Sequence, residues 1–157
     1  MKSLAILASG SGSNAENIIR YFSHSEFIKV AVVLSNNAGA GVHNRAKVLG
    51  IPSLTFSREE FAAGDVILET LKAYQVDFVV LAGFLSKVAD GLIEAFPRKI
   101  VNIHPALLPR YGGKGMYGMH VHRAVLAAGD TESGITIHYI DEHYDEGPVI
   151  YQATCPV

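Results

Sequence analysis

Short apolar runs alternate with stretches of helical periodicity along most of the chain. The apolar runs have the length of buried strands and predict strands at residues 4–8, 30–35, 78–81 and 100–103, with a weaker one at 53–55. Between them, apolar residues spaced three and four apart predict helices at residues 14–22, 42–49, 58–74 and 88–95. This alternation predicts an α/β fold, a doubly wound and mostly parallel open sheet with helices on both faces.

The pattern changes in the last third of the chain. Residues 134–140 and 148–154 are β-rich and are joined by the acidic segment 141–147, which predicts an adjacent antiparallel pair. Residues 107–119 contain four glycines and are expected to form a long, mobile surface loop.

Composition narrows the class of protein. A chain of 157 residues that is 49% hydrophobic supports one core, so we expect a single domain over residues 1–157. The net charge of -2 gives no basic stripe for nucleic acid. The longest apolar runs are too short for a membrane span, and the apolar stretch at residues 4–8 is too short for a secretory signal. Cys155 is the single cysteine, so no intramolecular disulfide can form, and cytoplasmic residence is expected. The expected oligomeric state is a monomer or a homodimer.

A glycine-serine turn follows the first predicted strand and opens the first predicted helix. Backbone N–H groups and the helix dipole favour an anion at such a place, and a phosphate is the natural ligand. Gly12 lets the backbone approach the ligand, while Ser13 and Asn14 supply polar side chains.

The turn admits three other interpretations. The spacing fits a dinucleotide fingerprint, but the second strand ends in Ser35, Asn36 and Asn37 without the acidic residue that holds a ribose. No Gly-Lys-Ser/Thr follows, which disfavours a nucleoside triphosphate. A turn that merely caps the helix stays open as the structural interpretation.

Asn102 and His104 lie at the carboxyl end of the strand predicted at residues 100–103. Being two apart on an extended segment, they point to the same side and can act on one atom. A histidine donates a proton near neutral pH, and an asparagine amide can stabilise an oxyanion. A nearby carboxylate would keep His104 protonated, for which Asp145 is the first candidate and Asp141 the second. A purely structural role of His104 stays open.

Other chemistry is less well supported. No serine or cysteine nucleophile stands in a recognisable context, which favours direct attack by a substrate amine. His120 and His122 lack a third ligand at metal spacing, so no metal site is expected. His138 is interpreted equally well as a pocket residue or a core residue.

Four segments together carry a family resemblance. They are Ser9-Gly10-Ser11-Gly12-Ser13-Asn14, Leu81-Ala82-Gly83-Phe84, Asn102-Ile103-His104-Pro105-Ala106-Leu107-Leu108-Pro109 and Asp145-Glu146-Gly147-Pro148-Val149-Ile150. Through them almost the whole chain resembles the phosphoribosylglycinamide formyltransferases, folate-dependent enzymes of purine (IMP) synthesis. The resemblance implies a formyltransferase-like fold that continues, in the family, into a C-terminal helical region beyond Val157.

The resemblance also implies a set of site residues. It places the substrate phosphate at Gly12, Ser13 and Asn14. It makes Asn102, His104 and Asp145 the catalytic residues. It assigns the formyl folate to Arg58, Leu85, Ser86, Lys87, Val88, Asn102, Asp141, Glu142 and Asp145. Arg58 would hold the folate tail carboxylate by a charge-assisted hydrogen bond.

The reaction implied is direct transfer of a formyl group from 10-formyltetrahydrofolate, as co-substrate, to the amine of glycinamide ribonucleotide. Asn102 and protonated His104 would stabilise the tetrahedral oxyanion. Two alternatives stay open: a folate-dependent formyltransferase of the methionyl-tRNA type, and a non-catalytic folate- or nucleotide-binding module.

Overall fold

The computed structural model describes residues 1–142 and 146–157 of the chain. It divides into two compact units, Met1–Ile100 and Val101–Val157, and each is described by itself.

The first unit alternates strands and helices, as the sequence predicts. Its elements, in chain order, are β1 (Lys2–Leu7), α1 (Ser13–Phe22), β2 (Ile28–Ser35), α2 (Val42–Val48), β3 (Ser53–Thr55), α3 (Arg58–Ala63), α4 (Asp65–Ala73), β4 (Phe78–Leu81) and α5 (Asp90–Ala95). The predicted strands all recur, two of them with the predicted bounds.

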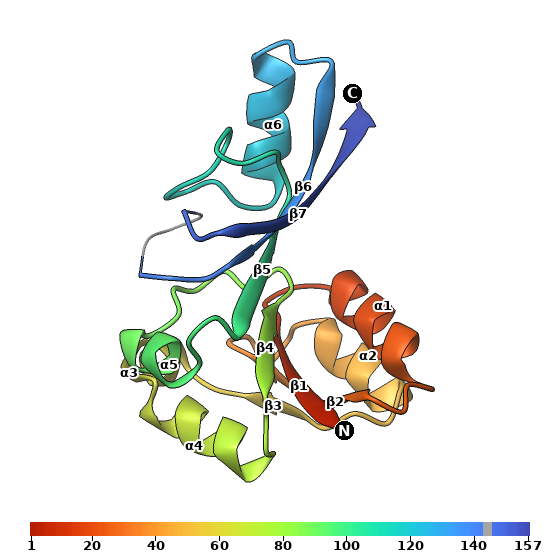
Figure 1. Cartoon of the computed structure of the whole chain (residues 1–157), viewed down its shortest axis with the longest axis vertical. Helices are drawn as coiled ribbons and strands as arrows, with labels where there is room; N and C mark the ends of the chain where they lie inside the picture. The colour runs from red at the N-terminus through yellow and green to blue at the C-terminus, as the bar shows by residue number, and fades with distance from the viewer. Residues whose placement is uncertain (143–145) are drawn as a thin grey trace. The chain divides into compact units, whose positions relative to one another are not determined.

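The four strands of this unit run parallel. β1 lies in the middle and pairs with β2 and β4, while β3 pairs with the outer side of β2. Figure 1 shows α1 and α2 on one face of these strands and α3, α4 and α5 on the other. All four carboxyl ends therefore meet at one edge, where ligands bind in open α/β sheets.

The core of the first unit explains why β1 reads as a continuous apolar run. Leu4, Ile6 and Ala8 pack in a cluster that includes Ala15, Ile19, Val42 and Ala46 of α1 and α2. The alternate residues Ala5 and Leu7 are also buried, 0% and 1% exposed. A strand covered by helices on both faces has no solvent side, so the positions of β1 from Leu4 onward are all apolar.

The single helix predicted at residues 58–74 is wrong. The chain breaks at Gly64, which has φ +84° and ends α3 while it begins α4. A Cβ there would lie 2.8 Å from Ala89 Cβ, so the site requires glycine on both conformational and packing grounds. The helix predicted from residue 88 begins at Asp90 instead.

The second unit is antiparallel. β5 (Ile100–His104), which begins at the last residue of the first unit, is followed by α6 (Met119–Ala127), β6 (Glu132–Tyr139) and β7 (Val149–Pro156). β6 pairs antiparallel with β5 on one side and with β7 on the other. The predicted β pair is thereby confirmed, whereas α6 was not predicted from the sequence. Residues 105–118 form neither helix nor strand.

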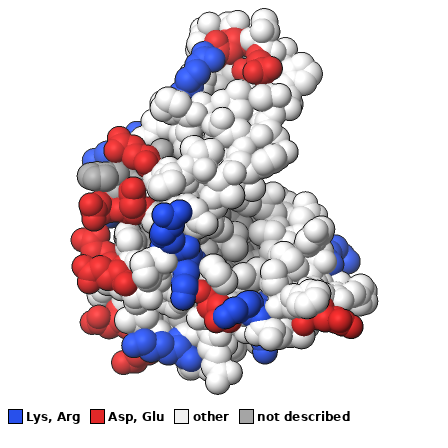
Figure 2. All heavy atoms as spheres, in the orientation of Figure 1, with Lys and Arg blue, Asp and Glu red and all other residues white. Residues whose placement is uncertain are grey.

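Charges of both signs occur on the face of the molecule shown in Figure 2. The acidic side chains gather mainly along the side where Figure 1 places α3 and α5. Within the described part of the chain, no helix combines the length and apolarity needed to cross a bilayer.

Candidate functional site

The glycine turn leads from β1 into α1 and leaves the first turn of that helix open. Gly12 is the residue before the helix and has φ +78°, and no side chain accepts a hydrogen bond from the start of α1 in the part of the chain described. Ser13 and Asn14 are exposed beside it. The first N–H groups of a helix have no acceptor within the helix, so this geometry suits an anion better than the capping interpretation.

The turn is packed tightly against the beginning of α2. A Cβ at Gly12 would lie 2.6 Å from Cβ of Val42, and one at Gly41 would lie 3.2 Å from Cα of Ser11. The Val42 N–H donates to the Gly10 carbonyl over 3.2 Å. Both glycines thus serve a close approach between the turn and α2.

Polar side chains link the carboxyl ends of three neighbouring strands in the first unit. The Leu85 N–H donates to Ser9 Oγ over 2.9 Å, and Ser9 N–H donates to the Gly83 carbonyl. Asn36 Nδ2 donates to Ser86 Oγ over 2.7 Å. These contacts fix the segment after β4 against the ends of β1 and β2, a role for Asn36 that the sequence did not indicate.

Several residues assigned to the folate by resemblance lie together in the first unit. Arg58, the exposed first residue of α3, lines one surface depression with Ser86, Lys87 and Val88. Ser57 caps α3 and makes a reciprocal pair with Glu60, which holds Arg58 at the start of the helix. Leu85 is 56% exposed and is not among the residues lining this depression.

In the second unit, Asn102 is held by a buried histidine on the neighbouring strand. Asn102 on β5 lies directly opposite His138 on β6, and Asn102 Nδ2 donates to His138 Nε2 over 3.2 Å. His138 Nδ1 lies 3.0 Å from the Tyr139 carbonyl. A carbonyl can only accept, so Nδ1 carries the hydrogen and Nε2 accepts from Asn102. His138 is fully buried, so of the two interpretations left open, a core residue that orients Asn102 is the one observed.

His104 is buried at the end of β5, with 3% of its surface exposed. Its Nε2 lies 2.7 Å from the Tyr111 carbonyl and therefore carries a hydrogen that it donates. Tyr111 has φ +55°, a conformation that costs a non-glycine residue about 1–2 kcal/mol. The surrounding contacts must hold it there, and no pattern in the sequence indicates this partner of His104.

Asp130 fixes Tyr111 from the other side. Its Oδ2 accepts from the Tyr111 hydroxyl and from Arg110 NH2, each over 2.5 Å. The Tyr111 hydrogen bond, followed by Arg110, lowers the pKa of Asp130, and the same carboxylate raises the pKa of Tyr111. The start of the loop after β5 is thus anchored at Arg110 and Tyr111. The sequence predicts a mobile surface loop here and does not indicate this anchor.

This anchor predicts a pH-dependent stability difference. The depressed pKa means that the Asp130 contribution is fully present above its ordinary pKa of 3.8 and is lost as pH falls through the lower folded value. Denaturant unfolding of Asp130→Asn and the wild type should therefore differ by a constant amount near neutral pH, with the difference shrinking below pH 3.8. Tyr111→Phe, which keeps the carboxylate, should weaken this pH dependence. A difference that is the same at about pH 3 and at neutrality would contradict the assignment.

Thr136 organises the chain that follows His104. It lies opposite His104 in the strand register and is fully buried. Its Oγ1 donates to the Ala106 carbonyl over 2.7 Å and accepts from the Leu108 N–H over 3.0 Å. Gln152 Nε2 from β7 lies 2.9 Å from the same oxygen. The exit from β5 is thereby fixed to the neighbouring strand β6 and, through Gln152, to β7.

The remaining predicted residues follow β6. Asp141 is half-buried and Glu142 exposed, directly after the strand. Asp145 lies outside the described residues, so its assignment stays a prediction. Among residues 1–142 and 146–157, no group of three or more His, Cys, Asp and Glu side chains is placed to hold a metal ion.

Comparison with known proteins matches this chain to one family. The family model described as "Formyl transferase" matches residues 2–157. The "Phosphoribosylglycinamide formyltransferase, chloroplastic" of Vigna unguiculata is 42% identical over 99% of this chain and 52% of its own length. The "Phosphoribosylglycinamide formyltransferase" of Haemophilus influenzae is 38% identical over 100% of this chain and 74% of its own.

A solved structure extends the comparison to the fold. Glycinamide ribonucleotide transformylase 1 from Symbiobacterium toebii superposes with a TM-score of 0.91 at 36% identity, covering 100% of this chain and 74% of that one. The α/β, formyltransferase-like fold predicted from the sequence is confirmed. The chain spans about half (52%) of the length of the plant relative.

Proposed function

This chain belongs to the formyl transferase family, and from that premise we propose that it transfers a formyl group from 10-formyltetrahydrofolate to the amine of glycinamide ribonucleotide, in purine (IMP) biosynthesis. The names of the plant, Haemophilus and Symbiobacterium relatives support this choice of substrate. The cytoplasm is the proposed compartment, and a monomer or homodimer the proposed state.

The observation that carries the proposal is the pair of oriented donors on β5. Asn102 is aligned by His138 over 3.2 Å, and the Nε2 hydrogen of the buried His104 is already directed at an oxygen 2.7 Å away. Asn102 keeps a second amide hydrogen for a reacting oxygen, and His104 exchanges the Tyr111 carbonyl for that oxygen when charge develops on it. This is the arrangement that an acyl or formyl transfer requires.

In the proposed reaction, the neutral substrate amine attacks the formyl carbon. A new carbon–nitrogen bond forms, and the carbonyl electrons move to oxygen, giving a tetrahedral oxyanion. Asn102 donates an amide hydrogen to this oxygen, and His104 donates a ring hydrogen. The bond from carbon to the folate nitrogen then breaks, and the proton lost by the amine reaches that nitrogen through His104 or water. Asp145 is proposed to keep His104 protonated.

The other substrate groups are assigned to the first unit. The phosphate is placed at Gly12, Ser13 and Asn14, where the open start of α1 offers backbone N–H groups. The folate tail carboxylate is placed at Arg58, in the depression lined with Ser86, Lys87 and Val88. Leu85, Asp141 and Glu142 complete the proposed folate contacts.

The test is a spectroscopic transfer assay on the purified chain. Glycinamide ribonucleotide and 10-formyl-5,8-dideazafolate are mixed with the protein, and loss of the formyl group is followed by absorbance, with each substrate omitted in turn. Turnover that requires both substrates is expected, with none when methionyl-tRNA replaces the ribonucleotide. Binding of both ligands without turnover would overturn the proposal in favour of a binding module.

A further inference from the structure

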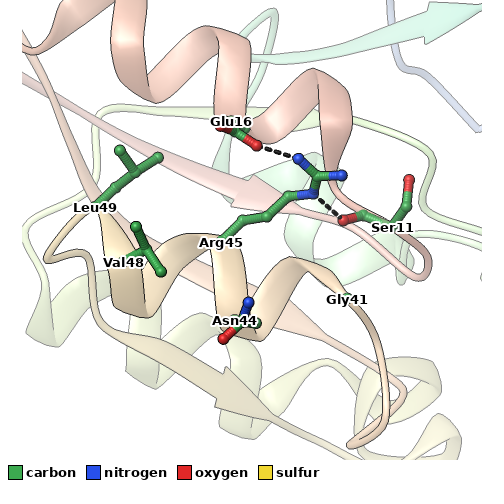
Figure 3. A pocket seen from close by; sticks show the side chains of 7 residues that line it. All are labelled: Ser11, Glu16, Gly41, Asn44, Arg45, Val48 and Leu49. Carbon is green, nitrogen blue, oxygen red and sulfur yellow. Dashed lines mark hydrogen bonds and ion pairs between the residues drawn. The ribbon is translucent and has the colours of Figure 1, made fainter.

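One side chain of α2 reaches across to the glycine turn from outside the predicted ligand contacts. Arg45 lines a surface pocket together with Ser11, Glu16, Gly41, Asn44, Val48 and Leu49. Figure 3 shows its guanidinium extended between the turn and α1, with its hydrogen bonds to both. Nothing in the proposed chemistry uses this residue.

The guanidinium of Arg45 makes two different contacts. Its Nε donates to the Ser11 carbonyl over 2.7 Å, and its NH1 donates to Glu16 Oε2. The rigid, planar fork of a guanidinium holds both partners in a fixed geometry, whereas an ammonium group on its flexible stem does not fix their relative position. Arg45 therefore ties the backbone of the turn to the first helical turn of α1.

The contact with Ser11 sets the direction of the next N–H group. In a planar trans peptide the carbonyl and the following N–H point in opposite directions. With the Ser11 carbonyl turned toward the guanidinium of Arg45, the N–H of Gly12 points away from that guanidinium. Gly12 itself cannot swing back freely, because it is packed against Val42.

Ion pairing with Arg45 keeps Glu16 ionised but offsets its negative charge, which would otherwise oppose anion binding. A carboxylate in the first turn of α1 would repel a phosphate at the start of the same helix. The hydrogen bond from Arg45 is the largest cause that lowers the pKa of Glu16, followed by that from Arg20. Arg20 bonds the other carboxylate oxygen, Oε1, over 2.9 Å but makes no contact with Ser11 among the hydrogen bonds of the described residues.

We propose that Arg45 is a positioning residue for the phosphomonoester of the substrate, because it holds the Ser11 carbonyl so that the Gly12 N–H faces the phosphate. This inference rests on the proposed function, whose phosphate site it deepens. Arg45 touches neither the reacting atoms nor the residues assigned to the folate.

The test compares two substrates in three variants. Arg45→Ala should lower kcat/KM for glycinamide ribonucleotide about tenfold or more, through KM, since hydrogen bonds to charged groups have effects of this size. In Arg45→Ala, kcat/KM for the dephosphorylated glycinamide ribonucleoside should stay within about twofold of the wild-type value, and so should KM for the folate. Arg45→Lys, which keeps the charge without the fork, should recover part of the loss. Arg20→Ala is the matched control, because it removes the other partner of Glu16 and leaves Ser11 untouched.

Two outcomes would overturn the inference. In the first, Arg45→Ala and Arg20→Ala lower kcat/KM for glycinamide ribonucleotide by the same factor. In the second, Arg45→Ala lowers kcat/KM equally for the phosphorylated and the dephosphorylated substrate, as a general structural defect would. Inorganic phosphate, followed by its ³¹P line width, separates this inference from the proposed function. A wild type that binds phosphate more tightly than Arg45→Ala but never turns over would refute the function alone. Equal phosphate binding by the two proteins would refute the role of Arg45.

Discussion

Replacing His104 with alanine should lower kcat for formyl transfer by at least about a hundredfold, which corresponds to losing one preorganised donor to the oxyanion. KM for either substrate should change little, because the hydrogen bond is needed mainly when charge develops on the oxygen. The measurement is steady-state kinetics with glycinamide ribonucleotide and the dideazafolate analogue. At rest the ring hydrogen is donated to the Tyr111 carbonyl 2.7 Å away and passes to the reacting oxygen only when charge develops there, so the expected loss is of transition-state stabilisation.

Because His104 is only 3% exposed, the alanine variant leaves a gap in the fold, and its unfolding must be measured alongside. His104→Gln retains an amide donor and much of the volume, and should keep more activity. His24→Ala, at an exposed position in the first unit, is the matched control and should behave as the wild type. A folded His104→Ala protein with turnover within about threefold of normal would remove His104 from the chemistry.

Gly12→Ala should both destabilise the first unit and weaken binding of the phosphorylated substrate. The new Cβ would lie 2.6 Å from Cβ of Val42, closer than two carbon atoms can approach. Overpacking of this kind costs about 1–3 kcal/mol, and the left-handed conformation at φ +78° adds to it. Denaturant unfolding should show the loss in free energy, and KM for glycinamide ribonucleotide should rise.

Gly10→Ala provides the comparison within the same turn. A Cβ at Gly10 would meet no atom within 4 Å, so its free energy of unfolding should stay close to that of the wild type. Equal stability of the two alanine variants would show that the close approach to α2 is not a constraint. A Gly12→Ala protein that is destabilised but keeps its KM would separate the turn from the phosphate.

Much of the fold follows from local pattern. The strands at Phe78–Leu81 and Ser53–Thr55 have the predicted bounds. For Phe78–Leu81 the reason is that a strand of a parallel sheet is a compact apolar run between polar ends. The sequence pattern does not reveal the break at Gly64, because Phe61, Leu68 and Leu71 keep a helical spacing of seven and three residues across it. Glycine is necessary there because of its left-handed conformation, φ +84°, and because of the contact with Ala89, which joins segments distant in the sequence.

α6 was missed for a different reason. It buries Val121 and Val125 but has an otherwise mixed sequence, and it follows directly on a glycine-rich segment that indicates a loop. Gly118 precedes it without a side-chain cap, so the usual start signal is absent from this helix. Two buried positions four residues apart are a weak periodic signal.

In the candidate site, too, local pattern predicts some residues, whereas others are found only through contacts between segments distant in the sequence. Asn102 and His104 were predictable, because alternation along a strand places both on one side. Their partners were not: His138 reaches Asn102 only through the antiparallel register of β5 and β6, and Tyr111 holds His104 through a backbone carbonyl. Neither relation leaves a trace in local composition.

The bond from His104 to the Tyr111 carbonyl sets a condition on any group that takes the carbonyl's place. A neutral oxygen would replace one uncharged acceptor with another, an exchange with little net gain. A negatively charged oxygen forms a shorter bond that is about twice as strong, so it displaces the backbone acceptor readily. The hydrogen bond from His104 to the Tyr111 carbonyl therefore gives way to the short-lived anion but not to the neutral substrate. A donor that binds the anion selectively increases kcat and adds little to the affinity for substrate.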